Sequence, residues 1–407
     1  MVAVYFSGAQ IPYQPVADRF LQFFNRQQAD SIFYMYAPVL QEKLSLEKNK
    51  SVMNGLYVQF GELRSLSLVK KDSAYAHFRA NFKDQALTLV LALNKERFIE
   101  GLRFIPFAPE QKKNQEIKSN IFLPSPKGNI YGTIKIPSNV QKQIPVVLII
   151  AGSGPTDRNG NQAPSLNTNT YQMIADSLLK AGIASLCYDK RGVGESAGAL
   201  VSESEIVFED YIHDAVGFIK LLKGDRRFSK VIVLGHSEGS LIGMVAATQV
   251  QVDGFISVAG AGERIDKIIE KQLNAQSPAL AEKAKILFDS LKMGKTVADP
   301  GGDLKALFRP SIQPYMISWL KFNPAEEIRK LNMPILLIQG NTDLQISMQD
   351  VQLLKLAAPS ARLVIINQMN HVLKQAETDR SKNLATYNQP DLPIKAELVQ
   401  AIGGFVH

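Results

Sequence analysis

Short apolar runs that alternate with helical patterns organise the chain beyond residue 115. Helical spacing of apolar residues is clear at 171–181 and 206–222, and a glycine closes each segment. Nearly continuous apolar runs are typical of parallel strands that are buried on both faces. Six such runs lie at residues 146–151, 183–188, 231–234, 255–258, 335–338 and 363–366, and two earlier runs, 117–123 and 130–136, predict an antiparallel pair. The pattern therefore predicts a doubly wound, mostly parallel α/β sheet of eight strands.

One insertion interrupts this alternation. Residues 262–331 contain only helical patterns, placed around a loop at 298–302. Seventy residues are too many for one crossover, so we expect a helical cap over the carboxyl ends of the strands. The only tryptophan, Trp319, lies there with Tyr315 four residues before it. We expect Trp319 and Tyr315 to line a substrate pocket, with packing inside the cap as the alternative.

A separate pattern precedes the sheet. Residues 15–108 begin with a helical stretch that carries Phe20, Phe23 and Phe24, and continue with alternating strand patterns at 65–69, 75–82 and 87–93. This order predicts a small N-terminal α+β domain. A polar stretch at 109–115 reads as the linker, and a second domain then occupies residues 116–407.

Composition narrows the classes of protein that the chain can represent. Its 407 residues are enough for two domains, and no run reaches the roughly 18 apolar residues of a membrane span. The net charge of +8 comes from scattered residues, so we expect no nucleic-acid partner. The single cysteine, Cys187, excludes an internal disulfide and makes a thiolate metal cluster implausible.

The first ten residues resemble the end of a secretion signal. An apolar stretch at 2–6 is followed by small residues at 7–10, although a basic segment does not precede them. If the natural chain starts further upstream, the protein is exported. A periplasmic or secreted location is the expectation, and a frayed terminus of a cytoplasmic protein is the alternative.

The pentapeptide Gly235-His236-Ser237-Glu238-Gly239 fits G-x-S-x-G and directly follows the apolar run at 231–234. A serine on a sharp strand-to-helix turn exposes its hydroxyl, and flanking glycines let strand and helix approach closely. The motif is weak alone in a chain with 27 glycines, but its position between a strand and a helix makes Ser237 the predicted nucleophile.

A serine nucleophile needs a histidine base. The chain has five histidines, and four are in unsuitable places: inside the elbow, in the N-terminal domain, inside a helix and at the last position. The remaining one, His371, follows the last strand run at 363–366. Loops after strand carboxyl ends build the active site of a doubly wound sheet, so His371 is the predicted base.

The acid that orients this base is expected between Ser237 and His371 in sequence. Asp343 follows the strand run at 335–338, whereas its rival Asp350 falls in the next helix, where a carboxylate is usually solvated. Asp343 is therefore the predicted acid, and capping of a turn is its structural alternative.

An oxyanion hole would complete the set. One donor is the backbone N–H of Glu238, and the second is expected from the loop after strand run 146–151, from Ser153 or alternatively from Gly154. This loop does not fit a dinucleotide fingerprint, because Asp157 takes the place of the third glycine. We find neither a phosphate loop nor metal-ligand spacing, so we expect no cofactor and no metal.

The chain resembles the α/β-hydrolase superfamily over about residues 117–407. Besides the elbow, residues 189–196 are similar to the D-x-R-G-x-G-x-S turn of many members, and segments 152–160, 343–345 and 369–374 resemble bacterial serine carboxylesterases. Residues 15–105 resemble an N-terminal domain of the DUF3887, nuclear-transport-factor-2-like type. The resemblance implies hydrolysis of short-acyl esters with Ser237, Asp343 and His371 as the triad.

These observations predict a cofactor-independent serine esterase that acts on a small-molecule ester through an acyl-enzyme. A serine peptidase or acyltransferase with the same triad is one alternative, because sequence does not reveal the leaving group. A binding scaffold without catalysis is the other. The role of the N-terminal domain stays open, and a homodimer that it mediates is one possibility.

Overall fold

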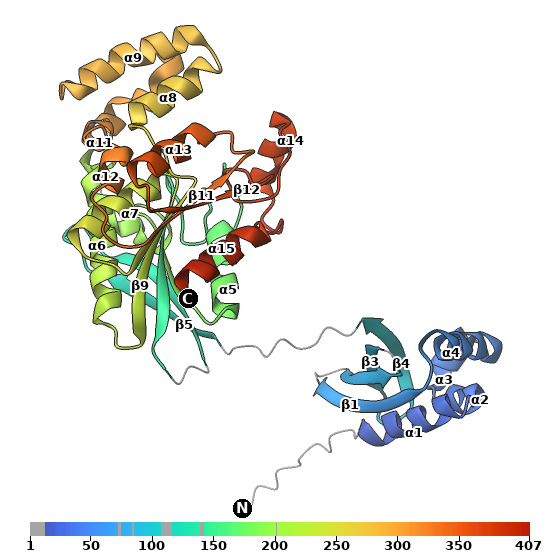
Figure 1. Cartoon of the computed structure of the whole chain (residues 1–407). Helices are drawn as coiled ribbons and strands as arrows, with labels where there is room; N and C mark the ends of the chain where they lie inside the picture. Colours follow the sequence, from blue (N-terminus) through green and yellow to red (C-terminus); the bar gives the residue numbers. More distant parts are fainter. Residues whose placement is uncertain (1–12, 72–74, 84, 107–115, 139–141, 201) are drawn as a thin grey trace, which may run out of the picture. The chain divides into compact units, whose positions relative to one another are not determined.

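The computed structural model describes residues 13–71, 75–83, 85–106, 116–138, 142–200 and 202–407. The chain divides into two compact units, Met1–Lys112 and Lys113–His407, which are shown in Figure 1 and are treated separately below. The signal-like segment at 2–10 and the whole polar stretch at 109–115 that was predicted as a linker lie outside the described residues.

The N-terminal unit packs helices against an antiparallel sheet. Its four strands lie in the order β1-β2-β3-β4. Phe20 and Phe24 of the first helix lie in one core with Phe78 and Phe82 of the second strand. The last strand was not predicted from the sequence. The elements are α1 (Gln14–Asn25), α2 (Ala29–Phe33), α3 (Pro38–Lys43), α4 (Leu46–Phe60), β1 (Leu63–Lys71), β2 (Ala76–Phe82), β3 (Ala86–Leu93) and β4 (Ile99–Pro106).

The second unit is built on one sheet of eight strands, and all eight predicted strand runs are confirmed. The order is β12-β11-β10-β9-β7-β8-β6-β5. The six strands β7 to β12 pair in parallel, while β6 pairs antiparallel with both β5 and β8. The strands are β5 (Glu116–Leu123), β6 (Ile130–Pro137), β7 (Ile144–Ile150), β8 (Ala184–Tyr188), β9 (Phe228–His236), β10 (Gly254–Val258), β11 (Ile335–Gly340) and β12 (Arg362–Ile366).

Helices cover both faces of this sheet, which explains the continuous apolar runs. Along β7, Val146 and Leu148 enter one core, whereas Val147 and Ile149 enter the other. The first core includes residues of α6 (Phe208–Gly224), α7 (Glu238–Gln249) and α13 (Met348–Ala357), and the second includes residues of α5 (Thr170–Lys180) and α15 (Ala396–Val406). Side chains on both faces of β7 are thus buried from Val146 to Ile150, because each face has its own helical layer.

The insertion at 262–331, all of which is described, consists of helices and turns, as predicted for a cap. Its longer helices, α8 and α9, lie together at the end of the sheet where the carboxyl ends of the parallel strands are (Figure 1). The cap helices are α8 (Ile265–Asn274), α9 (Pro278–Lys292), α10 (Lys305–Phe308), α11 (Gln313–Trp319) and α12 (Pro324–Ile328), and α14 (Arg380–Ala385) follows later.

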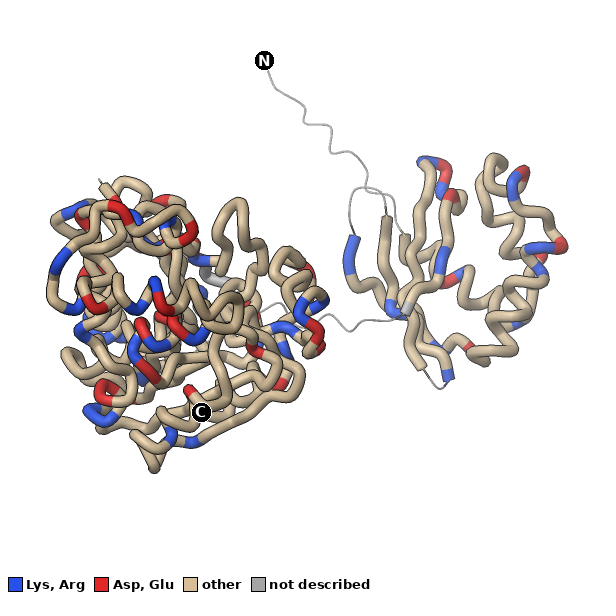
Figure 2. The backbone as a smooth tube through the Cα atoms, turned by 90° about the horizontal axis from the view of Figure 1, so that it is seen from above, with Lys and Arg blue, Asp and Glu red and all other residues tan. Residues whose placement is uncertain are grey.

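Charged residues are interspersed over both units. Figure 2 shows Lys and Arg positions intermingled with Asp and Glu positions in each unit, with uncharged stretches between them. Within the described ranges, every helix is too short or too polar to cross a lipid bilayer.

Helix α7 approaches the sheet very closely at the turn after β9. A Cβ atom on Gly235 would lie 2.2 Å from the carbonyl oxygen of Gly239, and one on Gly239 would lie 2.3 Å from the carbonyl oxygen of Ile150. Both contacts are with backbone, which cannot swing away like a side chain. Glycine is therefore required at both positions, and its absence would push α7 off the sheet.

We expect Gly235→Ala to lower the free energy of unfolding by about 1–3 kcal/mol or more, because the added methyl overlaps the backbone of Gly239. Urea unfolding measures the loss. The matched control is Gly403→Ala in α15, where a Cβ meets no atom within 4 Å; there we expect unchanged or slightly higher stability. Equal stability of the two variants would contradict the packing argument.

Candidate active site

Ser237 occupies the sharp turn between β9 and α7. Its backbone has φ 54° and ψ −121°, a region that residues other than glycine rarely adopt. The Ser237 N–H donates to the carbonyl oxygen of Val258 on the neighbouring strand at 2.9 Å, which helps to hold the turn. This strained conformation lifts the hydroxyl out of the strand end, as expected for a nucleophile elbow.

The structure brings the three predicted triad residues together from three loops. His371 lies after β12, and its Nε2 is 3.1 Å from the Ser237 Oγ. Its Nδ1 is 2.8 Å from Oδ2 of Asp343, which lies after β11. A carboxylate only accepts hydrogen bonds, so Nδ1 carries the proton and Nε2 faces the serine hydroxyl as an acceptor. This is the tautomer that a general base requires.

Asp343 is held as an anion although its side chain is only 1% exposed. Burial alone would raise its pKa, but the neighbouring His371 and the N–H groups of Ile346 and Gln345 outweigh that effect and lower the pKa below its usual value. Those two N–H groups donate to Oδ1 at 3.0 and 2.8 Å. Its second oxygen is thereby left to orient the imidazole.

The rival acid, Asp350, has a structural role. It is the third residue of α13, and its Oδ2 accepts from the N–H and the hydroxyl of Ser347 in a capping box. Its Oδ1 accepts from the N–H of Gly262 at the start of the cap. Asp350 therefore joins the cap to α13, away from the His371 imidazole.

The predicted oxyanion donors surround Ser237. Glu238 is the first residue of α7, so its N–H has no acceptor within the helix. In the loop after β7, Gln162 Nε2 donates to the carbonyl oxygen of Ser153 at 2.6 Å. Because the Ser153 carbonyl and the Gly154 N–H belong to one peptide group, this bond holds the Gly154 N–H in place. The Ser153 N–H belongs to the preceding peptide group, which is held by a hydrogen bond to the Gly152 carbonyl oxygen.

Lys190 is a residue of this site that sequence reasoning missed. Its Nζ donates to the carbonyl oxygen of Gly152 at 3.0 Å and to Oε1 of Glu238 at 2.8 Å. The same ammonium lies 4.1 Å from the ring centre of Tyr211. One buried cation therefore contacts both chain segments that carry the predicted oxyanion donors. The only signal was its place in the conspicuous turn at 189–196.

His236 links the oxyanion loop to the base. The Gly152 N–H donates to the Tyr171 hydroxyl at 3.0 Å, which lies 2.8 Å from Nδ1 of His236. Nε2 of His236 is 2.9 Å from the carbonyl oxygen of His371. A carbonyl only accepts, so Nε2 carries the proton and Nδ1 accepts from Tyr171. Burial first, and then the charge of His371, lower the pKa of His236 to about 3.

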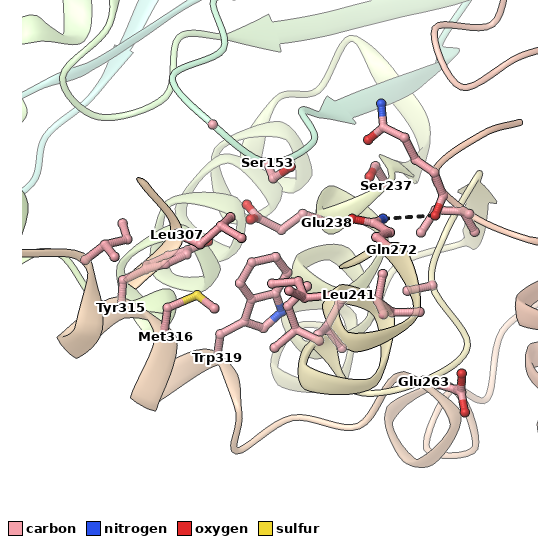
Figure 3. A pocket seen from close by; sticks show the side chains of 18 of the residues that line it. Ser153, Ser237, Glu238, Leu241, Glu263, Gln272, Leu307, Tyr315, Met316 and Trp319 are labelled. Carbon is pink, nitrogen blue, oxygen red and sulfur yellow. Dashed lines mark hydrogen bonds between the residues drawn. The ribbon is translucent and has the colours of Figure 1, made fainter. Parts of the chain in front are cut away.

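Two cavities open on either side of Ser237. The cap cavity, of about 340 Å³, is lined mainly by aliphatic and aromatic side chains (Figure 3), among them Leu241, Ile268, Ile269, Leu307, Met316 and Trp319. The loop cavity, of about 260 Å³, is richer in polar side chains, among them Thr156, Gln162, Ser165, Thr168 and Tyr387. Ser153, Ser237 and Gln345 line both cavities.

Trp319 both packs inside the molecule and lines a cavity, so each of its two predicted roles describes part of its surroundings. Its ring stacks on Phe208 with centroids 5.4 Å apart and planes at 7°, which is packing of the cap on α6. It also lines the cap cavity, as does the buried Tyr315. Both predicted pocket residues therefore face the same space as Ser237.

Groups suited to metal binding are not gathered in the described part of the chain. Those residues contain no cluster of three or more His, Cys, Asp or Glu side chains that could hold an ion. Cys187 is a buried thiol on β8, and burial raises its pKa to about 12.

We expect Lys190→Met to lower the free energy of unfolding by about 3–5 kcal/mol, because it leaves the Glu238 carboxylate buried without its counterion. The two side chains are 3% and 2% exposed. The double variant Lys190→Met/Glu238→Gln, measured by urea unfolding, should regain much of this loss. Lys382→Met breaks an exposed pair with Glu377 and should leave the unfolding midpoint unchanged. A double variant no more stable than Lys190→Met would contradict the expectation.

We expect stability to fall in acid partly because of His236. Its folded pKa of about 3 lies below the unfolded value of 6.5, so its contribution is fully present above pH 6.5 and is lost as pH falls toward 3. The loss from this group is at most about 5 kcal/mol. Unfolding free energies measured against pH should decline less steeply in His236→Gln than in the wild type. Parallel curves would refute the assignment.

Comparisons with known proteins agree with this architecture. A family model described as serine aminopeptidase, S33, matches residues 167–309. Esterase EstD of Thermotoga maritima is 24% identical over 379 residues, covering 88% of this chain and 87% of that protein. This alignment is longer than the second unit, so it includes part of the N-terminal unit.

Solved esterase structures are also similar to the chain. Est1E of Butyrivibrio proteoclasticus with bound ferulic acid is 15% identical, with 70% of this chain and 98% of that chain covered and a TM-score of 0.46. Esterase Pf2001 of Pyrococcus furiosus is 15% identical, with 74% and 94% covered and a TM-score of 0.47. The sheet order and the strand-turn-helix at Ser237 give the second unit an α/β-hydrolase fold, and the serine aminopeptidase model matches part of that unit.

Proposed function

We propose that the protein is a carboxylic ester hydrolase that works through a Ser237-His371-Asp343 triad and an acyl-enzyme. The observation that carries the proposal is the unbroken hydrogen-bonded series from Ser237 Oγ through the imidazole to Asp343, placed between two cavities. The relative EstD is named an esterase, and this chain matches it over most of its length.

The reaction follows from the geometry. The Ser237 Oγ attacks the ester carbonyl carbon while its proton moves to Nε2 of His371, and Asp343 stabilises the imidazolium. The N–H groups of Glu238 and of Ser153 or Gly154 hold the oxyanion. Collapse breaks the bond to the alcohol oxygen, which takes the proton from Nε2. Water then attacks the acyl-enzyme by the same steps and releases the acid.

The position of His371 sets the direction of the ester. His371 lines the loop cavity and is absent from the lining of the cap cavity. The alcohol must take its proton from Nε2, so it leaves on the loop-cavity side. The acyl group then lies in the cap cavity, whose limited volume and apolar walls suit a short or medium acyl chain.

A serine peptidase is the second candidate, because the matching family model is described as a serine aminopeptidase. The same residues would then expel an amine instead of an alcohol. A non-catalytic scaffold is the least favoured candidate, since it has no need for a base in the correct tautomer beside a strained serine.

A fluorophosphonate probe should label Ser237 in the folded protein, and mass spectrometry locates the adduct. Ser237→Ala should lower kcat for p-nitrophenyl butanoate by about 10⁴-fold or more, and Asp343→Asn by about 10²- to 10⁴-fold, because the imidazole loses its orienting anion. Asp350→Asn, the matched control, should retain activity within about threefold. Aminoacyl p-nitroanilides should react much more slowly than the esters.

Three outcomes would overturn this proposal. Absence of label on Ser237 in folded protein would exclude the nucleophile. Turnover that survives Ser237→Ala would show that the activity comes from elsewhere. Faster cleavage of the anilides than of the esters would favour the peptidase.

A further inference from the structure

One oxygen of Glu238 stands out in the cap cavity. Oε1 accepts from Lys190, whereas Oε2 has no hydrogen bond of full geometry from the described residues, although the Tyr315 hydroxyl interacts with the same carboxylate and the side chain is only 2% exposed. Figure 3 shows the side chain extending from the elbow toward Leu307 and Tyr315. A buried acceptor therefore lies in the wall of the space that we assign to the acyl group, beside Tyr315.

The other charged groups of the cavity already have partners. Glu263 accepts from Lys271, and Arg309 donates to Glu203. The neutral side-chain amide of Gln272, which also lines the cavity, donates to the backbone carbonyl oxygen of Gln345. Glu238 thus differs from its neighbours, because a buried carboxylate oxygen without a donor is costly to leave unsatisfied. A ligand that supplies a donor at this point would remove that cost.

The surroundings favour a hydroxyl over an ammonium as this donor. Lys190 already balances the charge of Glu238, so an ammonium would bring an uncompensated charge into an apolar cavity. Tyr315 lines the same cavity, and burial, followed by the charge of Glu238 and a side-chain interaction with that carboxylate, holds the pKa of its hydroxyl well above the usual value. That hydroxyl is protonated and can donate. A ligand hydroxyl can accept from Tyr315 and donate to Glu238, whereas an ammonium cannot accept.

We propose that the protein selects esters whose acyl part is largely apolar but carries a hydroxyl group, and that Oε2 of Glu238 accepts the hydrogen bond of that hydroxyl. The inference rests on the proposed esterase function and on the acyl group lying in the cap cavity. Glu238 then has two roles, because its backbone N–H donates to the oxyanion and its side chain selects the acyl group.

The test compares hydroxyacyl esters with methyl isosteres of the same shape. 4-Methylumbelliferyl 2-hydroxybutanoate, 3-hydroxybutanoate and 6-hydroxyhexanoate are paired with the 2-methylbutanoate, 3-methylbutanoate and heptanoate. Rates are normalised to alkaline hydrolysis of each ester. We expect kcat/KM of the wild type to favour the hydroxyl by about tenfold or more in at least one pair, since the isostere leaves a buried acceptor unpaired. The preference should persist when an ethyl ester replaces the aryl ester, because the acyl side causes it.

Glu238→Gln can turn an amide donor toward the cavity, so the ratio should fall to about one or below. A ratio taken within one variant cancels any general loss of activity. Glu263→Gln, in the same cavity, is the matched control and should keep the wild-type ratio. If Glu238→Gln does not fold, Tyr315→Phe should lower the ratio by removing the second partner.

The outcomes separate this inference from the proposed function. If the wild type hydrolyses every methyl isostere at least as fast as its hydroxyacyl partner, the inference is overturned and the esterase assignment stands. A water molecule is then the partner of Glu238. An unchanged ratio in folded Glu238→Gln also overturns it. Failure to hydrolyse any ester of the panel overturns the esterase itself.

Discussion

The contact between the backbone of α7 and the end of the sheet is the constraint on which the site depends. With no Cβ on Gly235 or Gly239, the first turn of the helix lies against the carbonyl oxygens of β7. The chain must then reverse within one residue, and Ser237 takes the positive φ that this reversal demands. The same approach brings the N–H of Glu238 toward the loop after β7. One packing contact therefore sets the nucleophile and the oxyanion donor together.

Much of the fold could be predicted because its physical causes are local. The central strands are buried on both faces and have no polar side to interrupt the apolar run, so they could be recognised from the sequence. The candidate triad could also be found, because few histidines follow a strand and each partner sits just beyond a strand run. In the N-terminal unit, β4 was missed because Gly101 and a register shift near Leu93 break its alternation.

The features that could not be predicted are contacts between residues that are far apart in the sequence but close in the folded chain. Lys190 and Glu238 are residue types that normally lie on the surface, and 48 positions separate them in sequence. Their ion pair becomes visible only when the turn after β8 lies beside the elbow. Trp319 was left with two alternatives because stacking on Phe208 and facing a cavity both suit a large amphipathic ring. Such cases need the tertiary structure.

The bonds through His236 have a consequence for how the site is assembled. They join segments that are 65 and 135 residues apart, so they close only when distant parts of the chain have docked. During synthesis Ser237 emerges long before His371, so until then the serine lacks its proposed base, and the His236 imidazole lacks the carbonyl oxygen of His371 that accepts from its Nε2. On the proposed mechanism, the nascent chain has no esterase activity at that stage. Local opening of the segment around His371 disconnects base and oxyanion loop in one event.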